Sequence, residues 1–216
     1  KRKFLFFPII QKDQDFRLLL ENALPVSKIL EDTYHLEGRQ VLLFVGRLID
    51  IKNLFFLLDA LALVVNRYPK VILLFVGDGD QRVALERHAE RNGLADHVIF
   101  AGKKQGEDLY ACYNVGQIFI LPSYYERFGA VVNEALLAGC YTLCSVVAVA
   151  ACLIEPQKNG DLFDPASKTY LAEKLAQSLK DCEGLKQISL KANKMCYSYD
   201  QYITSFFNQL NSIIDK

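Results

Sequence analysis

Short apolar runs rich in branched side chains alternate with amphipathic segments from about residue 41 to residue 163. The apolar runs predict strands at Val41–Val45, Val71–Gly77, His97–Ala101, Gln117–Leu121, Tyr141–Ser145 and Asp161–Phe163. The segments between them predict helices at Asn53–Arg67, Gln81–Asn92, Gly106–Tyr113 and Val131–Ala138. Apolar strands alternating with helices are typical of a parallel sheet covered on both faces. The pattern therefore predicts an α/β fold, a Rossmann-like doubly wound parallel sheet.

The two ends of the chain fall outside this alternation. Residues 1–38 predict an N-terminal or interdomain linker segment, with helical character over Phe16–Glu31 that is interrupted near Pro25. Residues 39–216 predict the main domain. Beyond the last strand, the apolar periodicity predicts three further helices, at Lys168–Leu179, Gly184–Met195 and Tyr199–Ile214.

Composition narrows the class of protein. The chain has 216 residues, 51% of them hydrophobic, which is enough for one sizeable domain. Its 25 basic and 25 acidic residues give a formal net charge of zero, so no nucleic acid or anionic membrane surface is indicated as a partner. Six cysteines without a C-x-x-C pair indicate reduced thiols, and the three histidines lack ligand spacing. We therefore expect a cytoplasmic protein without a metal site.

Two carboxylates, Glu126 and Glu134, stand eight positions apart across a predicted loop-to-helix junction. Phe128-Gly129 breaks the chain between them, and Glu134 falls about one and a half turns into the helix. The free N–H groups and the dipole of a helix N-terminus favour an anion. Acceptors on both sides of an anion site suit a ligand with hydroxyls flanking a phosphate, such as a nucleotide-diphosphate sugar.

Arg47 and Lys52 lead from the end of the first strand into the first helix of the alternating region. A guanidinium can bind two phosphate oxygens at once, and an ammonium adds a point charge. The two residues suit a diphosphate leaving group, although ordinary surface cations would look the same in sequence.

The two-carboxylate stretch, Glu126-Arg127-Phe128-Gly129 through Glu134-Ala135-Leu136, resembles the E-x7-E signature of the retaining family 4 glycosyltransferases of GT-B fold. Other segments resemble that family in the same order: Val45-Gly46-Arg47 with Lys52-Asn53, Val76-Gly77-Asp78-Gly79, Leu121-Pro122-Ser123 and Asn159-Gly160. The resemblance extends from about Phe7 to the C-terminus, and the ordered set is more specific than any one motif.

The resemblance implies that residues 39–216 form the nucleotide-sugar-binding, C-terminal half of a GT-B enzyme. Such an enzyme transfers a hexose from a nucleotide-diphosphate sugar to a glycan or lipid-linked acceptor, with retention at the anomeric carbon and without a metal or other cofactor. The acceptor would bind through an N-terminal domain outside this chain, and that domain could also touch a membrane peripherally. The chain alone should then bind nucleotide weakly and turn over little.

The same resemblance assigns roles to the candidate site residues. Glu126, Arg47 and Lys52 would be catalytic: the carboxylate faces the transferred sugar, and the cations stabilise the leaving phosphate. Glu134 would bind the ribose hydroxyls, and its apolar helix neighbours lead us to expect a partner for it. The other donor contacts would come from Gly46, Gly102, Lys103, Phe128, Gly129, Ala130 and Val131.

Some of these residues also have structural interpretations. Phe128 could be a core aromatic as well as a donor contact. Gly77-Asp78-Gly79 reads as a structural turn. Gly102-Lys103 would form a wall for the base through main-chain groups.

The chain departs from the family after the predicted strand Tyr141–Ser145, where one or two glycines are usual. Val146–Ala151 contains none, and branched side chains adopt positive φ only at a cost. This loop favours an alternative, a non-catalytic nucleotide- or protein-binding module that has kept the fold. A nucleotide-sugar epimerase or a phosphorylase would need acid/base groups or a pyridoxal lysine that are not evident in the sequence. The base, whether uracil, guanine or adenine, is left open, as are the sugar and the acceptor.

Overall fold

The computed structural model describes residues 10–184 and 189–214. At its centre is a six-stranded sheet in which neighbouring strands are all parallel, in the order β3-β2-β1-β4-β5-β6. The strands are β1 Gln40–Val45, β2 Val71–Val76, β3 Val98–Phe100, β4 Ile118–Leu121, β5 Tyr141–Ser145 and β6 Gly160–Phe163. This is the strand order of the doubly wound dinucleotide-binding folds, so the predicted fold class is confirmed.

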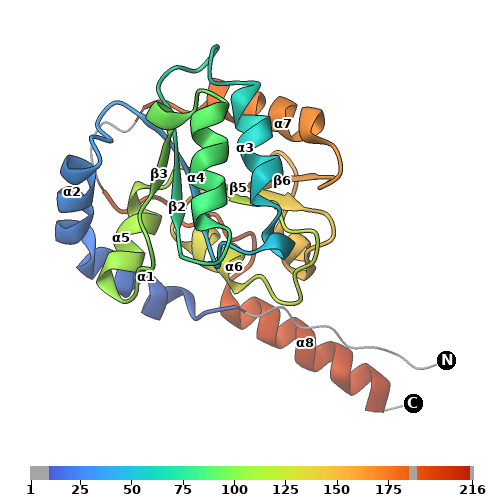
Figure 1. The fold of residues 1–216 in the computed structure, drawn as a ribbon. Helices are drawn as coiled ribbons and strands as arrows, with labels where there is room; N and C mark the ends of the chain where they lie inside the picture. The colour runs from blue at the N-terminus through green and yellow to red at the C-terminus, as the bar shows by residue number, and fades with distance from the viewer. Residues whose placement is uncertain (1–9, 185–188, 215–216) are drawn as a thin grey trace.

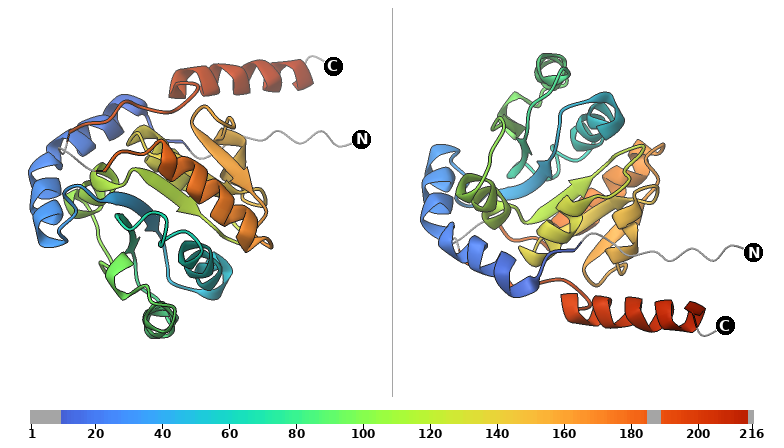
Figure 2. Two further views of the ribbon diagram at one scale, coloured as in Figure 1. Left: turned by 90° about the horizontal axis from the view of Figure 1, so that it is seen from above. Right: turned by 90° about the horizontal axis from the view of Figure 1, so that it is seen from below.

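Helices cover both faces of the sheet (Figures 1 and 2). In β1, Leu43 and its alternate neighbours point to the face covered by α1, α2, α5 and α6, whereas Leu42 and Phe44 point to the face covered by α3, α4 and α7. Because both faces are buried, β1 and β2 read as continuous apolar runs. The α-helices are α1 Asp13–Asn22, α2 Leu24–Thr33, α3 Leu54–Ala62, α4 Arg82–Arg91, α5 Glu107–Val115, α6 Ala130–Leu137, α7 Lys168–Lys180 and α8 Tyr199–Ile214. Short 3-10 helices are η1 Asp50–Lys52, η2 Ala95–His97 and η3 Val149–Leu153.

The first two helices belong to the packed body. Phe16 and Leu20 of α1 are buried, and the Phe16 ring meets the ring of Tyr110 on α5 edge-on, with 5.5 Å between centroids. Asn114 of α5 donates its Nδ2 hydrogens to the Leu20 carbonyl (2.8 Å) and to the Ser27 hydroxyl (3.0 Å). Buried amide hydrogen bonds therefore join α1, α2 and α5.

One predicted helix, Asn53–Arg67, is too long. Asn53 has a φ of 57°, a left-handed conformation that precedes the helix, and α3 ends at Ala62. Residues 63–67 form turns ahead of Pro69, whose ring disfavours a helical conformation at the residue before it. Most other predicted elements begin and end within three residues of the observed ones.

The helix predicted at Gly184–Met195 is wrong for residues 189–195, which are not helical; residues 185–188 lie outside the described part of the chain. The Lys191 ammonium donates to the carbonyls of Tyr113 (3.0 Å), Asn114 (2.8 Å) and Gly116, at the C-terminal end of α5. The N–H of Lys194 donates to Leu136 O of α6 (2.9 Å), where a helix would have directed it to residue 190. Tertiary contacts thus replace helical hydrogen bonds in this segment.

Helix α8 projects beyond the layered body (Figure 1). It is attached at its start, where the N–H of Tyr199 donates to Asp13 Oδ1 (3.0 Å) and Tyr202 packs against the core. Phe207, further along, is 53% exposed. Of the described helices, none combines the length and the apolar character that crossing a bilayer requires.

We predict that Lys191→Ala lowers the free energy of unfolding by about 2 kcal/mol, because the end of α5 loses a charged donor to three carbonyls. Urea denaturation would measure this as a lower midpoint at an unchanged slope. Lys180→Ala, at the exposed end of α7, is the control and should change stability by less than about 0.5 kcal/mol. Equal midpoints for the two variants would contradict the prediction.

Candidate functional site

The candidate site lies beyond the carboxyl ends of β1 and β4. These neighbouring strands form the topological switch point, because β2 and β3 extend the sheet from β1 whereas β5 and β6 extend it from β4. Arg47 follows β1, and Glu126 lies in the loop after β4. The Tyr124 N–H donates to Ile51 O (3.0 Å), so the two loops are joined by a main-chain hydrogen bond.

Lys52 and Glu126 form an ion pair across this switch point. Each side chain is only 15% exposed, so both charges are largely removed from water and each compensates the other. The second carboxylate oxygen of Glu126 faces the N–H groups of Phe128 (3.4 Å) and Gly129 (3.3 Å) at the entrance to α6. The sequence indicated both residues as site residues but not that they pair with one another.

Arg47 is exposed, and its side chain makes no hydrogen bond or ion pair with any residue in the described ranges. It differs in this from Lys52, five residues later, whose charge is matched by Glu126. Arg47 is therefore the cation of this loop that remains available to an anionic ligand.

Glu134 lies in the second turn of α6 and is partly buried. Its Oε2 accepts a hydrogen bond from the Tyr113 hydroxyl (2.7 Å), and its Oε1 lies 3.4 Å from Gln11 Nε2. The prediction that this carboxylate has a partner is confirmed. Sequence reasoning missed Tyr113; the available signal was a tyrosine on the apolar face of a predicted helix, where a buried hydroxyl requires a partner.

Gly129 has a φ of 68° and directly precedes α6. A Cβ atom there would lie 2.7 Å from the Ala150 Cβ, so a side chain is excluded both by conformation and by the approach of η3. Ala130 is the first helical residue, and Val131 packs against the core. Phe128 is 61% exposed, so its interpretation as a core aromatic is wrong.

The glycines after β1 and β2 allow their loops to touch. A Cβ on Gly77, whose φ is 146°, would lie 1.8 Å from the Gly46 carbonyl oxygen. Gly77 also donates its N–H to Gly102 O (2.9 Å), which links the ends of β2 and β3. The Gly77-Asp78-Gly79 turn is therefore structural, as predicted. Lys103 is exposed and follows β3. Strand β2 lies between β3 and β1, so Lys103 is separated from the Lys52–Glu126 pair.

The glycine-free loop at Val146–Ala151 supports Glu126 through the main chain. Its backbone contains no residue with positive φ, so it needs no glycine. The Val149 N–H donates to Glu126 O (3.0 Å), and Ala148 forms a parallel bridge with Glu126. Val146 and Val147 are 51% and 46% exposed, so the branched side chains lie on the surface.

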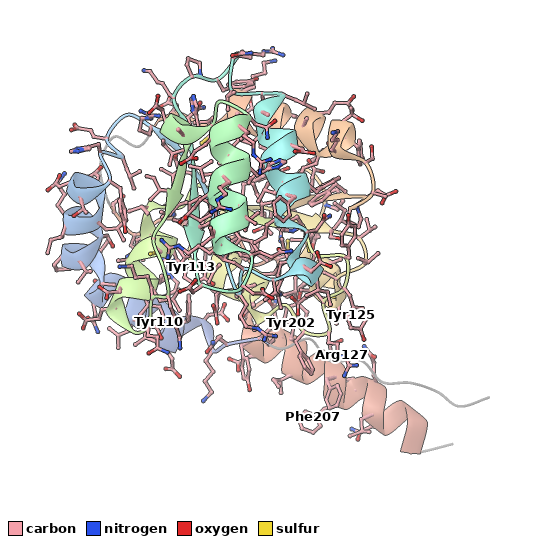
Figure 3. All side chains as sticks on the ribbon, in the orientation of Figure 1. Tyr110, Tyr113, Tyr125, Arg127, Tyr202 and Phe207 are labelled. Atoms are coloured by element: carbon pink, nitrogen blue, oxygen red, sulfur yellow. The ribbon has the colours of Figure 1, made fainter. Side chains whose placement is uncertain are left out.

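Exposed aromatic side chains border the same loops. Tyr124 and Tyr125 are each about half exposed, and Arg127 lies over the Tyr125 ring and donates to its hydroxyl (2.9 Å; Figure 3). Within the described residues, no three His, Cys, Asp or Glu side chains are grouped so that they could hold a metal ion. Metal-independent action remains a prediction.

Comparison with known proteins identifies the family. The model of the family "Glycosyl transferases group 1" matches residues 27–195, well over half of the chain. The chain therefore belongs to the group 1 glycosyltransferases.

Individual relatives agree with this assignment. An uncharacterized glycosyltransferase of Methanocaldococcus jannaschii is 30% identical over 161 residues, which cover 74% of this chain and 41% of that protein. The alpha-D-kanosaminyltransferase of Streptomyces kanamyceticus is 28% identical over 154 residues, which cover 71% of this chain and 40% of that protein. The chain thus spans about two fifths of the length of these relatives.

A solved structure shares the fold. HepE of Anabaena, crystallised in complex with UDP, superposes with a TM-score of 0.74 at 22% identity, covering 99% of this chain and 57% of that one. The same protein has also been solved with UDP-glucose. The Rossmann-like domain therefore has the fold of one half of a GT-B glycosyltransferase.

We predict that Gly129→Ala lowers the free energy of unfolding by about 1–3 kcal/mol, because the new methyl group meets Ala150 and the left-handed φ is unfavourable. Adding Ala150→Gly should recover only the part of this stability loss that comes from the contact with Ala150. Chemical denaturation of the single and double variants would measure the recovery. If the double variant lost as much stability as the two single variants lose together, the proposed contact would be contradicted.

Proposed function

We propose that this chain is the donor-binding part of a retaining glycosyltransferase, which transfers a hexose from a nucleotide-diphosphate sugar to a glycan or lipid-linked acceptor. The observation that carries the proposal is the arrangement at the β1–β4 switch point. Arg47, whose side chain has no described partner, the Lys52–Glu126 pair and the start of α6 all follow the carboxyl ends of β1 and β4, with Glu134 one turn further along α6.

The diphosphate would bind between Arg47 and the N-terminus of α6. Arg47 is exposed and has no described partner, so binding a phosphate breaks no existing ion pair. The first N–H groups of a helix have no intrahelical acceptor, and the helix dipole favours negative charge there. As the bond to the sugar breaks, charge on the leaving phosphate increases, and a guanidinium within reach stabilises it more strongly.

Glu134 would bind the ribose. An ionised carboxylate offers acceptor sites on both oxygens, and Tyr113 occupies one site on Oε2 only. Among the residues that the structure describes, the one hydrogen-bond partner of Oε1 is Gln11, at 3.4 Å and in an exposed position. That oxygen suits the vicinal hydroxyls of a ribonucleotide.

Glu126 would face the transferred sugar, while the ion pair with Lys52 holds its carboxylate in place. Negative charge beside the anomeric carbon stabilises a developing oxocarbenium ion. In a retaining reaction of this kind, the leaving phosphate would take the acceptor proton on the same face of the sugar, without a metal ion.

The comparisons support a nucleotide-sugar donor. The relatives named above are glycosyltransferases, and the Anabaena protein of the same fold was crystallised with UDP and with UDP-glucose. The alternative, a non-catalytic binding module that has kept the fold, is favoured only by the exposed valines of the loop at 146–151.

We predict that the protein binds one of UDP, GDP and ADP in a calorimetric titration, and that Glu134→Ala weakens this binding by about 1–3 kcal/mol. The lost interaction is the pair of hydrogen bonds from the ribose. Glu90→Ala, an exposed glutamate on α4, is the matched control and should bind like the wild type. Equal affinity of the two variants would place the ribose elsewhere.

We predict that Arg47→Ala reduces turnover more than binding. The release of nucleoside diphosphate from the preferred sugar nucleotide should slow by about 10²–10³-fold, because the lost contact strengthens in the transition state. Affinity for the diphosphate should fall by only about tenfold. Arg87→Ala, an exposed arginine on α4, controls for surface charge. Binding without any turnover in the unaltered protein, with its acceptor domain present, would favour the non-catalytic alternative.

A further inference from the structure

We infer that Tyr113 is a positioning residue for Glu134: its hydroxyl holds one carboxylate oxygen so that the other faces the ribose of the bound nucleotide. The inference rests on the proposed function, because it assumes that Glu134 binds the ribose. It adds a residue outside the site motifs, contributed by α5 from the middle of the core.

Tyr113 is rigidly held. Its side chain has no exposed surface. Its ring packs edge-on against Phe16, with 6.4 Å between centroids, and at the same distance against Phe119 of β4. Its main-chain carbonyl accepts a hydrogen bond from the Lys191 ammonium (3.0 Å). Packing against Phe16 and Phe119 therefore fixes the hydroxyl where it meets Glu134 of α6.

The hydroxyl donates to Glu134 Oε2 at 2.7 Å, the ordinary length of a good O–H···O bond. Burial, and then the neighbouring Glu134 charge, raise the pKa of Tyr113 well above its usual value. The phenol therefore stays protonated at all physiological pH values, so it acts as a permanent donor to this carboxylate.

The two oxygens of Glu134 consequently have different surroundings. Oε2 is directed inward to Tyr113, whereas Oε1, among the described residues, has only the 3.4 Å contact with Gln11 Nε2 at the exposed side. The last torsion of a glutamate has a broad, roughly two-fold energy profile, so a free carboxylate would rotate. Anchoring Oε2 removes that rotation, which lowers the entropic cost of binding a pair of ribose hydroxyls.

A purely structural role would predict something different. A buried tyrosine needs some partner for its hydroxyl, and Glu134 would satisfy that need with or without a ligand. Losing the hydroxyl would then reduce stability but would not change the preference for ribose over deoxyribose. The nucleotide preference therefore separates the two roles.

The test is a calorimetric comparison of wild type and Tyr113→Phe. Each is titrated with the preferred ligand among UDP, GDP and ADP, and with its 2′-deoxy counterpart. Tyr113→Phe should weaken ribonucleotide binding about five- to tenfold, with a much smaller effect on the deoxynucleotide. Tyr110→Phe, on the same helix and packed on the same Phe16 ring, is the control and should leave both affinities unchanged.

The outcomes are distinguishable. If wild type binds none of the three nucleotides, the proposed function fails, and the inference fails with it. If wild type prefers the ribonucleotide and Tyr113→Phe keeps that preference, the inference alone is overturned. Equal losses for both ligands also overturn it. If Tyr113→Phe does not fold, Tyr113→p-aminophenylalanine keeps the ring and a weaker donor; a reduced ribose preference supports the inference and an unchanged one overturns it.

Discussion

The site depends on one ion pair, between Lys52 and Glu126, at the point where the strand order reverses. Each side chain is only 15% exposed, and a carboxylate in such surroundings is costly unless it is paired. Because β1 and β4 are neighbours and parallel, their carboxyl ends meet at one edge, and a cation from one loop can meet an anion from the other. The pair holds the Glu126 carboxylate in place before any ligand arrives, so this part of the site is organised in advance.

Close packing of the surrounding loops makes this arrangement possible. The loop after β1 lies against the loop after β2, where only the absence of a Cβ on Gly77 leaves room for the Gly46 carbonyl. On the other side, Gly129 admits η3 against the start of α6, and η3 in turn holds the main chain of Glu126 through Val149. The valine-rich loop thus supports the main chain of Glu126 without any residue of positive φ, so it needs no glycine for this role.

The sequence predicts what local patterns determine. Apolar runs and turn residues predicted the strands and the sheet class, and the family resemblance indicated Arg47, Lys52, Glu126 and Glu134 as candidate site residues. What it missed depends on distant contacts. The Tyr113 hydroxyl meets a carboxylate 21 residues away, and the Lys191 ammonium meets carbonyls more than 70 residues away and keeps its own segment out of a helix. Neither contact has a local signature, and the pairing of Lys52 with Glu126, 74 residues apart, has none either.

In the proposed function, the charges at the site explain why the loss of Arg47 would reduce turnover more than nucleotide binding. The candidate site contains two cations, Arg47 and Lys52, and two carboxylates, Glu126 and Glu134, so their formal charges sum to zero before a ligand binds. In the proposed function, a diphosphate would therefore meet little net attraction in the ground state, and its binding would depend on directed hydrogen bonds from the start of α6 and to Glu134. Of these two cations, Arg47 is the one whose side chain has no partner among the described residues, so it would be available to stabilise the charge that develops on the leaving phosphate. In the proposed reaction, Arg47 would then stabilise the transition state more than the bound substrate, which is the condition for raising turnover.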